Sequence, residues 1–453
     1  MKIVTTCLFV MLLLITTVHA QGVGINTDGS QPNASALLDV KSTTKGMLFP
    51  RMSTNERNAI VNPVAGLLVF DLNEKTLYMY DGGKWVGFSP RPDYTRAVTN
   101  FEQPDLSDTS LTGYCVSMSA SFAAIGAPYA NNSGASSGAV YIYRLVNNVW
   151  QYFTKLTPPA NNPLAYYGLS VSVKGNFLVV GAPGQKNASD SLAGAAYFYT
   201  FNGTSWALTQ TIFGPGGNTY FGCAVAINPA GNYAAVGEEL SSQPYTEAGL
   251  VKIYFRSSST FALQQALQHF GPNYNDHFGH CLAINNNATR LIVGAPDRTS
   301  GMFTHMGYAG QFERTGTTWT ETYHYIPSVP QDGMVIGGSV DITDTAAIFT
   351  ANKNKDVHLL NTYWTKDSVI VLPSAVSSVC LDATTQAAYA FSDHKVYALT
   401  DFGYTRIKTL ELFNEFYFPL ISAYNKKYIV GLPTGIDFDK QFMGGFYFGE
   451  DTH

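Results

Sequence analysis

The hydrophobic and polar positions of this chain follow one pattern that recurs along most of its length. In the clearest copy, a Tyr167-Gly168 pair opens a first apolar stretch. A second stretch, Phe177–Val180, ends at Gly181-Ala182-Pro183, and a third, Gly194–Tyr199, follows a polar loop. Apolar runs of this length, bounded by Gly and Pro, are typical of β-strands.

The same order of elements returns at the period of a structural repeat. Marker glycines stand 54 to 58 residues apart, at Gly113, Gly168, Gly222, Gly279 and Gly337. The last strand of a unit commonly carries a large aromatic residue, as at Trp150, Trp206, Phe261 and Trp319. Four strands in a repeat of this length predict propeller blades or solenoid coils. The glycines are expected to shape turns and the aromatic residues to pack the sheets.

The two ends of the repeat array favour a ring over a linear solenoid. The seventh copy, which includes Ile429–Pro433 and Gly444–Phe448, stops after its third strand. Tyr94–Phe101, ahead of the first copy, resembles a fourth strand. A ring closed by an N-terminal strand has no free sheet edge. We therefore predict an all-β fold built on a seven-bladed β-propeller of four-stranded blades, with six or eight blades as the less favoured counts.

Two shorter regions precede the propeller, which is assigned to residues 91–453. Residues 1–20 are typical of a secretory signal peptide, because an early lysine and an apolar stretch lead to a small-residue cleavage site. No later segment is long and apolar enough to span a membrane. Residues 21–90 predict a small β-rich module and linker, with a hairpin turning at Asn73-Glu74 and a short helix after Ser53, whose spacing to Glu56 is that of a capping box.

The small module resembles a known N-terminal module. Ala34–Val40, Lys45–Met52, Gly66–Phe70 and Tyr80–Trp85 keep the order seen in a module of many secreted Bacteroidota proteins and of tail-fibre-like proteins. The resemblance implies a fibre-like or display module without known chemistry, which could form a homotrimer through residues 21–90. A simple cap on the following domain is the alternative.

The repeats resemble the FG-GAP repeats of integrin-alpha-type propellers. The aromatic-Gly and Gly-Ala-Pro elements stand together in the second and fourth copies, whereas the third has Val236-Gly237-Glu238-Glu239 in place of Gly-Ala-Pro. Many members carry an acidic calcium loop ahead of the second strand. Here Val173–Asn176, Asn228–Asn232 and Asn285–Thr289 lack its carboxylates. We therefore expect plain turns, no metal and no cofactor.

Composition and charge narrow the classes of function. Only 13% of the 453 residues are charged and the formal net charge is -5, without a basic run, so a nucleic-acid partner is not expected. Four cysteines follow the predicted signal peptide, at Cys115, Cys223, Cys281 and Cys380. They fall at corresponding points of different repeats, which favours free buried thiols over disulfides.

Candidate chemistry is sparse, and no catalytic residue is assigned. Asp276, His277 and His280, in the polar segment 269–280, could in principle bind zinc, but a polar junction between blades is the favoured interpretation. Glu238 and Glu239 are adjacent on a strand and should point to opposite faces. Loops that begin at Tyr129, Gly184, Glu238 and Asp297 vary between copies and are the candidate binding surface, with solvated connections as the alternative.

These observations predict a secreted or cell-surface, non-enzymatic binding or adhesion protein that uses a propeller scaffold. Its partner would be an extracellular protein or glycan, and its ligand-binding residues stay unassigned. A propeller enzyme that acts on extracellular polysaccharide and a structural component of a fibre or envelope are the alternatives.

Overall fold

The computed structural model describes most of the chain from residue 22 to residue 450. The described ranges are 22–73, 76–88, 111–132, 134–159, 162–189, 192–327, 329–351, 355–361, 367–393, 395–400, 403–409, 420–436 and 442–450. The predicted signal peptide and the predicted closing strand Tyr94–Phe101 lie outside them. The chain divides into two compact units, Met1–Tyr94 and Thr95–His453. Within the described ranges, no helix is long and apolar enough to cross a membrane.

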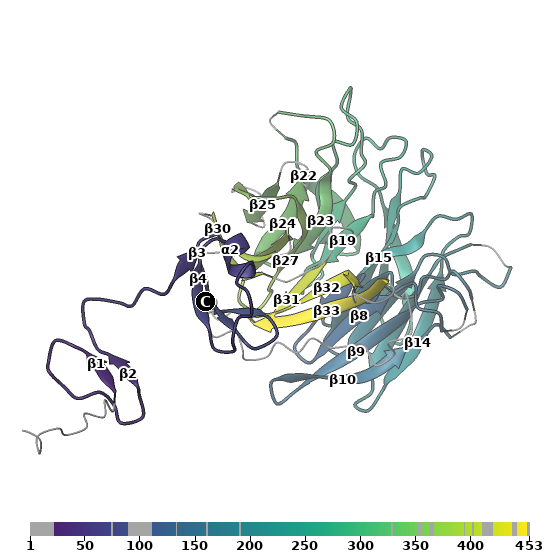
Figure 1. The fold of residues 1–453 in the computed structure, drawn as a ribbon. Coiled ribbons are helices and arrows are strands. Elements are labelled where there is room, and N and C mark those ends of the chain that lie inside the picture. The colour runs from purple at the N-terminus through teal and green to yellow at the C-terminus, as the bar shows by residue number, and fades with distance from the viewer. Residues whose placement is uncertain are drawn as a thin grey trace, which may run out of the picture. The chain divides into compact units, whose positions relative to one another are not determined.

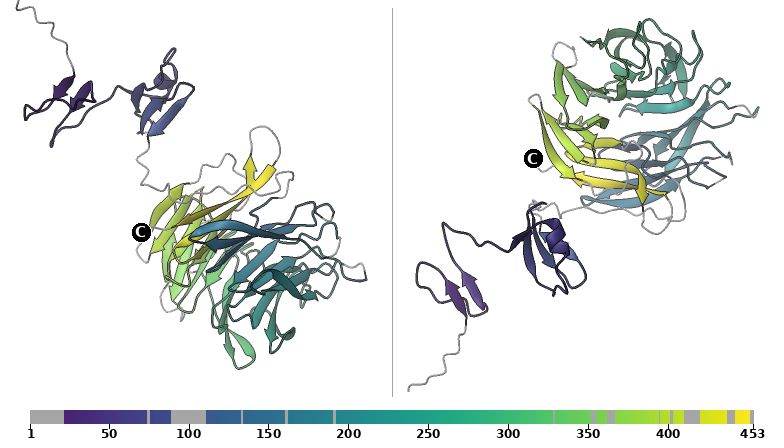
Figure 2. Two further views of the ribbon diagram at one scale, coloured as in Figure 1. Left: turned by 90° about the horizontal axis from the view of Figure 1, so that it is seen from below. Right: turned by 45° about the horizontal axis from the view of Figure 1, so that its top comes forward.

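The described residues of the first unit form two small sheets and one short helix (Figures 1 and 2). β1 (Val23–Ile25) pairs in parallel with β2 (Leu38–Val40). The second sheet is formed in order by β3 (Arg51–Met52), β4 (Leu68–Asp71), β5 (Thr76–Tyr80) and β6 (Trp85–Phe88). The helix α2 (Thr54–Asn58) begins after Ser53, and Ser53 and Glu56 form the capping box that the sequence predicted.

The second unit is built from consecutive antiparallel sheets, which we number in chain order. Sheet 1 contains β7 (Val116–Met118), β8 (Phe122–Ala127), β9 (Ala139–Val146) and β10 (Val149–Leu156). Sheet 2 contains β11 (Ser170–Lys174), β12 (Phe177–Ala182), β13 (Ala195–Phe201) and β14 (Trp206–Phe213). Sheet 3 contains β15 (Phe221–Ile227), β16 (Tyr233–Glu238), β17 (Leu250–Arg256) and β18 (Phe261–Leu267).

The later sheets repeat this order of strands. Sheet 4 contains β19 (Cys281–Ile284), β20 (Arg290–Gly294), β21 (Ala309–Thr315) and β22 (Thr318–His324). Sheet 5 contains β23 (Ile336–Ile342), β24 (Ala346–Ala351), β25 (Asp356–Asn361) and β26 (Asp367–Val371). Sheet 6 contains β27 (Val376–Leu381), β28 (Ala388–Ser392), β29 (Lys395–Thr400) and β30 (Gly403–Thr409). Sheet 7 has three described strands, β31 (Ile421–Tyr424), β32 (Lys427–Ile436) and β33 (Phe442–Glu450).

Each sheet packs against the next one along the chain, and sheet 7 packs against sheet 1 (Figure 1, yellow strands beside blue ones). Serine hydroxyls on the first strands join neighbouring sheets by accepting a backbone N–H of the following sheet. These pairs are Ser117 with Val173, Ser172 with Ile227, Ser339 with Val379, Ser378 with Ile421 and Ser422 with Met118. The last pair joins sheet 7 to sheet 1 by the same contact that joins sheet 1 to sheet 2.

The repeated glycines allow the backbones of neighbouring sheets to approach closely. A Cβ atom on Gly181 would lie 2.0 Å from the carbonyl oxygen of Gly222 in the next sheet. Gly431 of sheet 7 stands in the same relation to Gly113, also at 2.0 Å. Turn formation, which the sequence suggested for these glycines, is therefore not the whole of their role. At Gly181 and Gly431 the requirement is space between sheets, because any side chain would overlap a carbonyl group.

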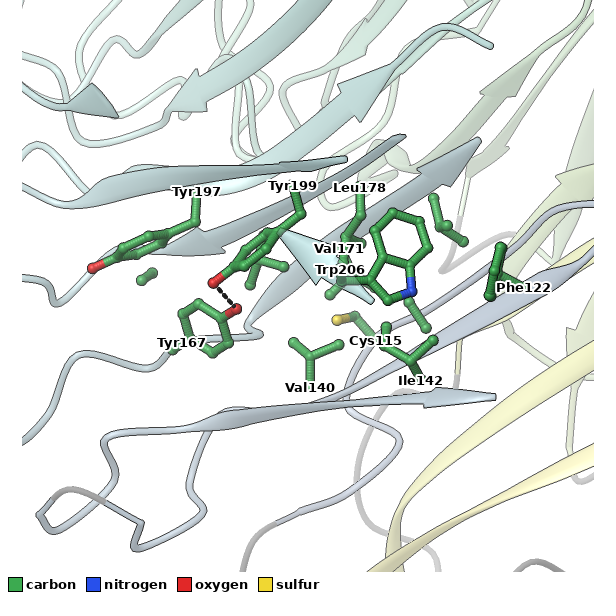
Figure 3. Packing of buried hydrophobic residues seen from close by; sticks show 14 of the residues in the cluster. Cys115, Phe122, Val140, Ile142, Tyr167, Val171, Leu178, Tyr197, Tyr199 and Trp206 are labelled. Carbon is green, nitrogen blue, oxygen red and sulfur yellow. Dashed lines mark hydrogen bonds between the residues drawn. The ribbon is translucent and has the colours of Figure 1, made fainter. Parts of the chain in front are cut away.

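Aromatic residues fill the space between the sheets, as predicted. On the last strand of sheet 2, Trp206 lies 5.0 Å from Phe122 of sheet 1, measured between ring centroids. Trp150 of sheet 1 stacks on Phe448 of sheet 7 at 5.0 Å. Figure 3 shows the core between sheets 1 and 2, where the Tyr167 and Tyr199 hydroxyls form a 2.7 Å hydrogen bond.

The four cysteines in the described residues are free, which confirms the preference for thiols over disulfides. Three of them donate a hydrogen bond to a marker-glycine carbonyl of the next sheet: Cys115 to Gly168, Cys223 to Gly279 and Cys281 to Gly337. Ser170 makes the same contact to Gly222 at 2.8 Å. A small side chain with one hydrogen to donate is what this position requires.

We expect these thiols to react with Ellman's reagent only after unfolding. Burial raises the pKa of all four thiols, to about 12 for Cys281, so the reactive thiolate is scarce at neutral pH. The chain without residues 1–20 should release little thionitrobenzoate when native and four equivalents in guanidinium chloride. Fewer than four equivalents after unfolding without reductant would show a disulfide, and rapid reaction of the native protein would contradict the burial.

Candidate functional site

One end of the sheets gathers polar and aromatic side chains. The segment before the first strand and the segment after the second strand meet at this end, because those two strands are antiparallel. In sheets 1 to 4 these segments bring together the residues that we call the aromatic-acidic cluster. Its members are Tyr114, Tyr129, Tyr166, Tyr220, Glu239 and His280.

The backbone before the first strand of sheets 1 to 5 holds an unusual conformation. The residue two positions ahead of the marker glycine has a positive φ in five successive copies: Leu111 at 46°, Tyr166 at 52°, Tyr220 at 61°, His277 at 54° and Val335 at 51°. The left-handed region is disfavoured for residues with a side chain. The repeat therefore imposes this loop shape, and the chain changes only the side chain that the loop presents.

Three tyrosines form the aromatic part of the cluster. The ring of Tyr129, which follows the second strand of sheet 1, lies 6.3 Å from Tyr114 and 5.4 Å from Tyr166, with an interplanar angle of 61° in both pairs. All three side chains are half-buried. Burial raises the pKa of Tyr114 to about 12, so its phenol is neutral at physiological pH.

Glu239 links the aromatic part to the histidines. It stands where other copies have the proline of Gly-Ala-Pro, and its carboxylate lies 2.7 Å from Nδ1 of His280. Burial is the main cause of the raised pKa of Tyr220, and the charge of Glu239 is the next. The same charge contributes to the raised pKa of Tyr114 in sheet 1. The carboxylate therefore acts on side chains from sheets 1, 3 and 4.

His277 and Asp297 form a second acid–imidazole pair beside the cluster. His277 Nδ1 lies 2.7 Å from Asp297, and its Nε2 lies 3.5 Å from Glu247. The Asp297 hydrogen bond raises the pKa of His277, and His277 in turn lowers the pKa of Asp297. Burial lowers the pKa of His280, but the hydrogen bond and charge of Glu239 outweigh it and leave a net increase. Both imidazoles are thus protonated at a higher pH than a free histidine.

The segment 269–280 divides between two locations. His269 and Asp276 are fully buried, with Nε2 of His269 3.0 Å from a carboxylate oxygen of Asp276, and His269 packs on Tyr308. His277 and His280 instead reach the end of the sheets. Over the part of the chain that the structure describes, no group of three His, Cys, Asp or Glu side chains could hold a metal ion.

Glu238 and Glu239 separate as the strand geometry predicted. Glu238 is fully buried and lies 2.8 Å from the ammonium group of Lys252, whereas Glu239 pairs with His280. The two carboxylates therefore lie in different surroundings.

Two of the three turns at the calcium-loop position are closed by amide side chains. Asn285 Oδ1 accepts the backbone N–H groups of Thr289 and Arg290, and Asn228 Oδ1 accepts those of Asn232 and Tyr233. A side-chain amide that accepts hydrogen bonds from its own turn stabilises that turn. Binding of a calcium ion at the same position would require carboxylate oxygens instead.

Sequence reasoning located part of this site. The variable loops that begin at Tyr129, Glu238 and Asp297 do supply cluster residues or their neighbours. The interpretation missed Tyr166 and Tyr220, which lie two positions ahead of their marker glycines, and Tyr114, which directly follows Gly113. Alignment of the copies on those glycines would have shown that the preceding loop also changes residue type from copy to copy.

Comparison with known proteins finds two matching family models, each over part of the chain. Residues 24–103 match the family model described as phage tail like trimerisation region. Residues 104–143 and 150–199 match the FG-GAP repeat model. No curated protein matches the chain. The repeated sheets therefore include FG-GAP repeats, and a phage-tail-like trimerisation region precedes them.

Proposed function

We propose that the second unit is a closed, seven-bladed propeller of the integrin-alpha type, and that it serves as a non-enzymatic binding or adhesion protein. We also propose that the protein is exported to the cell surface or the medium, as secreted Bacteroidota proteins are. FG-GAP repeats are typical of extracellular binding scaffolds, and the contacts of sheet 7 with sheet 1 repeat those between other neighbours.

One observation gives the main support for a role in binding. At a fixed position of a fixed loop the repeats present Leu111, Tyr166, Tyr220, His277 and Val335, all with the same left-handed backbone. A scaffold that preserves the loop while it varies the side chain is suited to recognition, because the contacts change without a change of fold. The aromatic-acidic cluster is the proposed ligand site.

The first unit would present this site in several copies. A trimerisation region over residues 24–103 supports assembly of three chains, and three tethered sites bind a surface more tightly than one. The ligand would be a protein or glycan on that surface.

The test is binding of the purified protein to arrays of glycans and extracellular matrix proteins, in parallel for wild type and Tyr129→Ala. We expect the wild type to retain at least one ligand and the variant to lose it. Tyr274→Ala, which removes another ring outside the cluster, is the matched control. Absence of binding by the wild type on every array, or equal binding by the wild type and Tyr129→Ala, would contradict the proposal. Light scattering should give three times the chain mass.

A further inference from the structure

The composition of the aromatic-acidic cluster narrows the chemistry of its ligand, and this step rests on the proposed function. Tyr129 stands edge to face with Tyr114 and with Tyr166, so neighbouring rings of the cluster are inclined to each other. The broad face of a sugar ring is better matched by a single open aromatic ring face. A compact rounded group fits mutually inclined rings.

The charges around these rings favour a positive ligand. Glu239 faces His280, Glu247 and Asp297 face His277, and the phenol of Tyr114 is neutral. The faces of neutral tyrosine rings attract cations, and a nearby carboxylate adds to that attraction. An anion would meet repulsion from the Glu239 carboxylate, whose charge reaches Tyr114.

A metal ion does not fit the same residues. The carboxylates of Glu239 and Asp297 are hydrogen-bonded to imidazoles, at 2.7 Å in each case. Hard metal ions need several convergent oxygen ligands, whereas an organic cation needs ring faces and a diffuse negative charge.

We propose that Tyr114, Tyr129 and Tyr166, with Glu239, bind an organic cation of the quaternary ammonium class carried by the extracellular ligand. Tyr220 belongs to the same cluster, and the charge of Glu239 contributes to its raised pKa after burial.

His280 and His277 make this binding depend on pH. His280 faces Glu239, Asp297 and His277, and His277 faces Asp297, Glu247 and Glu239. When protonated, both imidazoles compete with the ligand for the carboxylates. Because the pKa values of both imidazoles are raised above the ordinary 6.5, affinity should rise as the pH increases above 6.5 and the imidazoles lose their protons.

Calorimetry with choline tests the proposal against 3,3-dimethyl-1-butanol, which has the same shape without the charge. We expect choline to bind at least about tenfold more tightly than the alcohol, and Tyr129→Ala and Glu239→Gln each to weaken choline by about tenfold or more. Tyr274→Ala should bind as wild type. His280→Gln, which can donate a hydrogen bond but cannot carry a proton charge, should bind choline with a flatter pH profile. Unchanged melting temperatures exclude misfolding as the cause of any loss.

Equal affinity for choline and the alcohol, no binding of choline, or preference for a neutral monosaccharide would each overturn the inference. If choline fails while an array ligand still binds and is lost in Tyr129→Ala, the proposed function stands and only the ligand class is wrong. If Tyr129→Ala binds the array ligand normally, the proposed site itself is wrong.

Discussion

Gly431→Ala is expected to lower the free energy of unfolding by about 3 kcal/mol, at the upper end of what overpacking costs. The new Cβ would lie 2.0 Å from the carbonyl oxygen of Gly113. Gly431 does not need a positive φ, so the loss would come from steric overlap between sheet 7 and sheet 1. Urea denaturation of the purified protein measures the change.

Two matched variants serve as comparisons for Gly431→Ala. Gly126→Ala places a Cβ 2.0 Å from the carbonyl oxygen of Gly168, at the junction of sheets 1 and 2, and should cost about as much. Gly301→Ala meets no atom within 4 Å and introduces only the strain of a positive φ, so it should cost about 1 kcal/mol. If Gly431→Ala is no worse than Gly301→Ala while Gly126→Ala is severe, the ring is not closed through sheets 7 and 1.

Trp206→Ala is expected to destabilise the second unit by about 3 to 5 kcal/mol. The indole is 7% exposed and packs against Phe122 of sheet 1 and Phe201 of its own sheet, with ring centroids at 5.0 and 5.5 Å. Its removal would leave a cavity between two sheets, because the surrounding strands are fixed by their backbone hydrogen bonds. Thermal unfolding followed by circular dichroism measures the loss.

The equivalent variant at the other junction is Trp150→Ala, which removes the stack on Phe448 of sheet 7. A loss similar to that of Trp206→Ala is expected, because both indoles are 7% exposed. Leu263→Ala, on the exposed face of β18, serves as the control and should change stability by less than about 0.5 kcal/mol. Stability that is insensitive to Trp150→Ala would argue that the stack on Phe448 does not hold the two sheets together.

Local signals in the sequence were sufficient for the elements. Gly and Pro bound each apolar run, and the Ser53–Glu56 spacing predicted α2, because strand pairing, turns and caps depend on residues near one another in the chain. The repeat then related distant strands to one another, which is why four strands per sheet could be predicted. The prediction for Gly181 was incomplete, because Gly222, the residue that leaves no room for a side chain there, lies in the next sheet.

By itself, the sequence determined the strands, their grouping in repeats and the free thiols of this protein. Only the tertiary structure decided that Tyr114, Tyr129, Tyr166 and Glu239 lie at one end of the sheets and act on one another. These residues come from three sheets and are separated by many positions in the chain. Their proximity depends on how each sheet packs on its neighbours. That packing cannot be predicted from a local pattern of hydrophobic and polar residues.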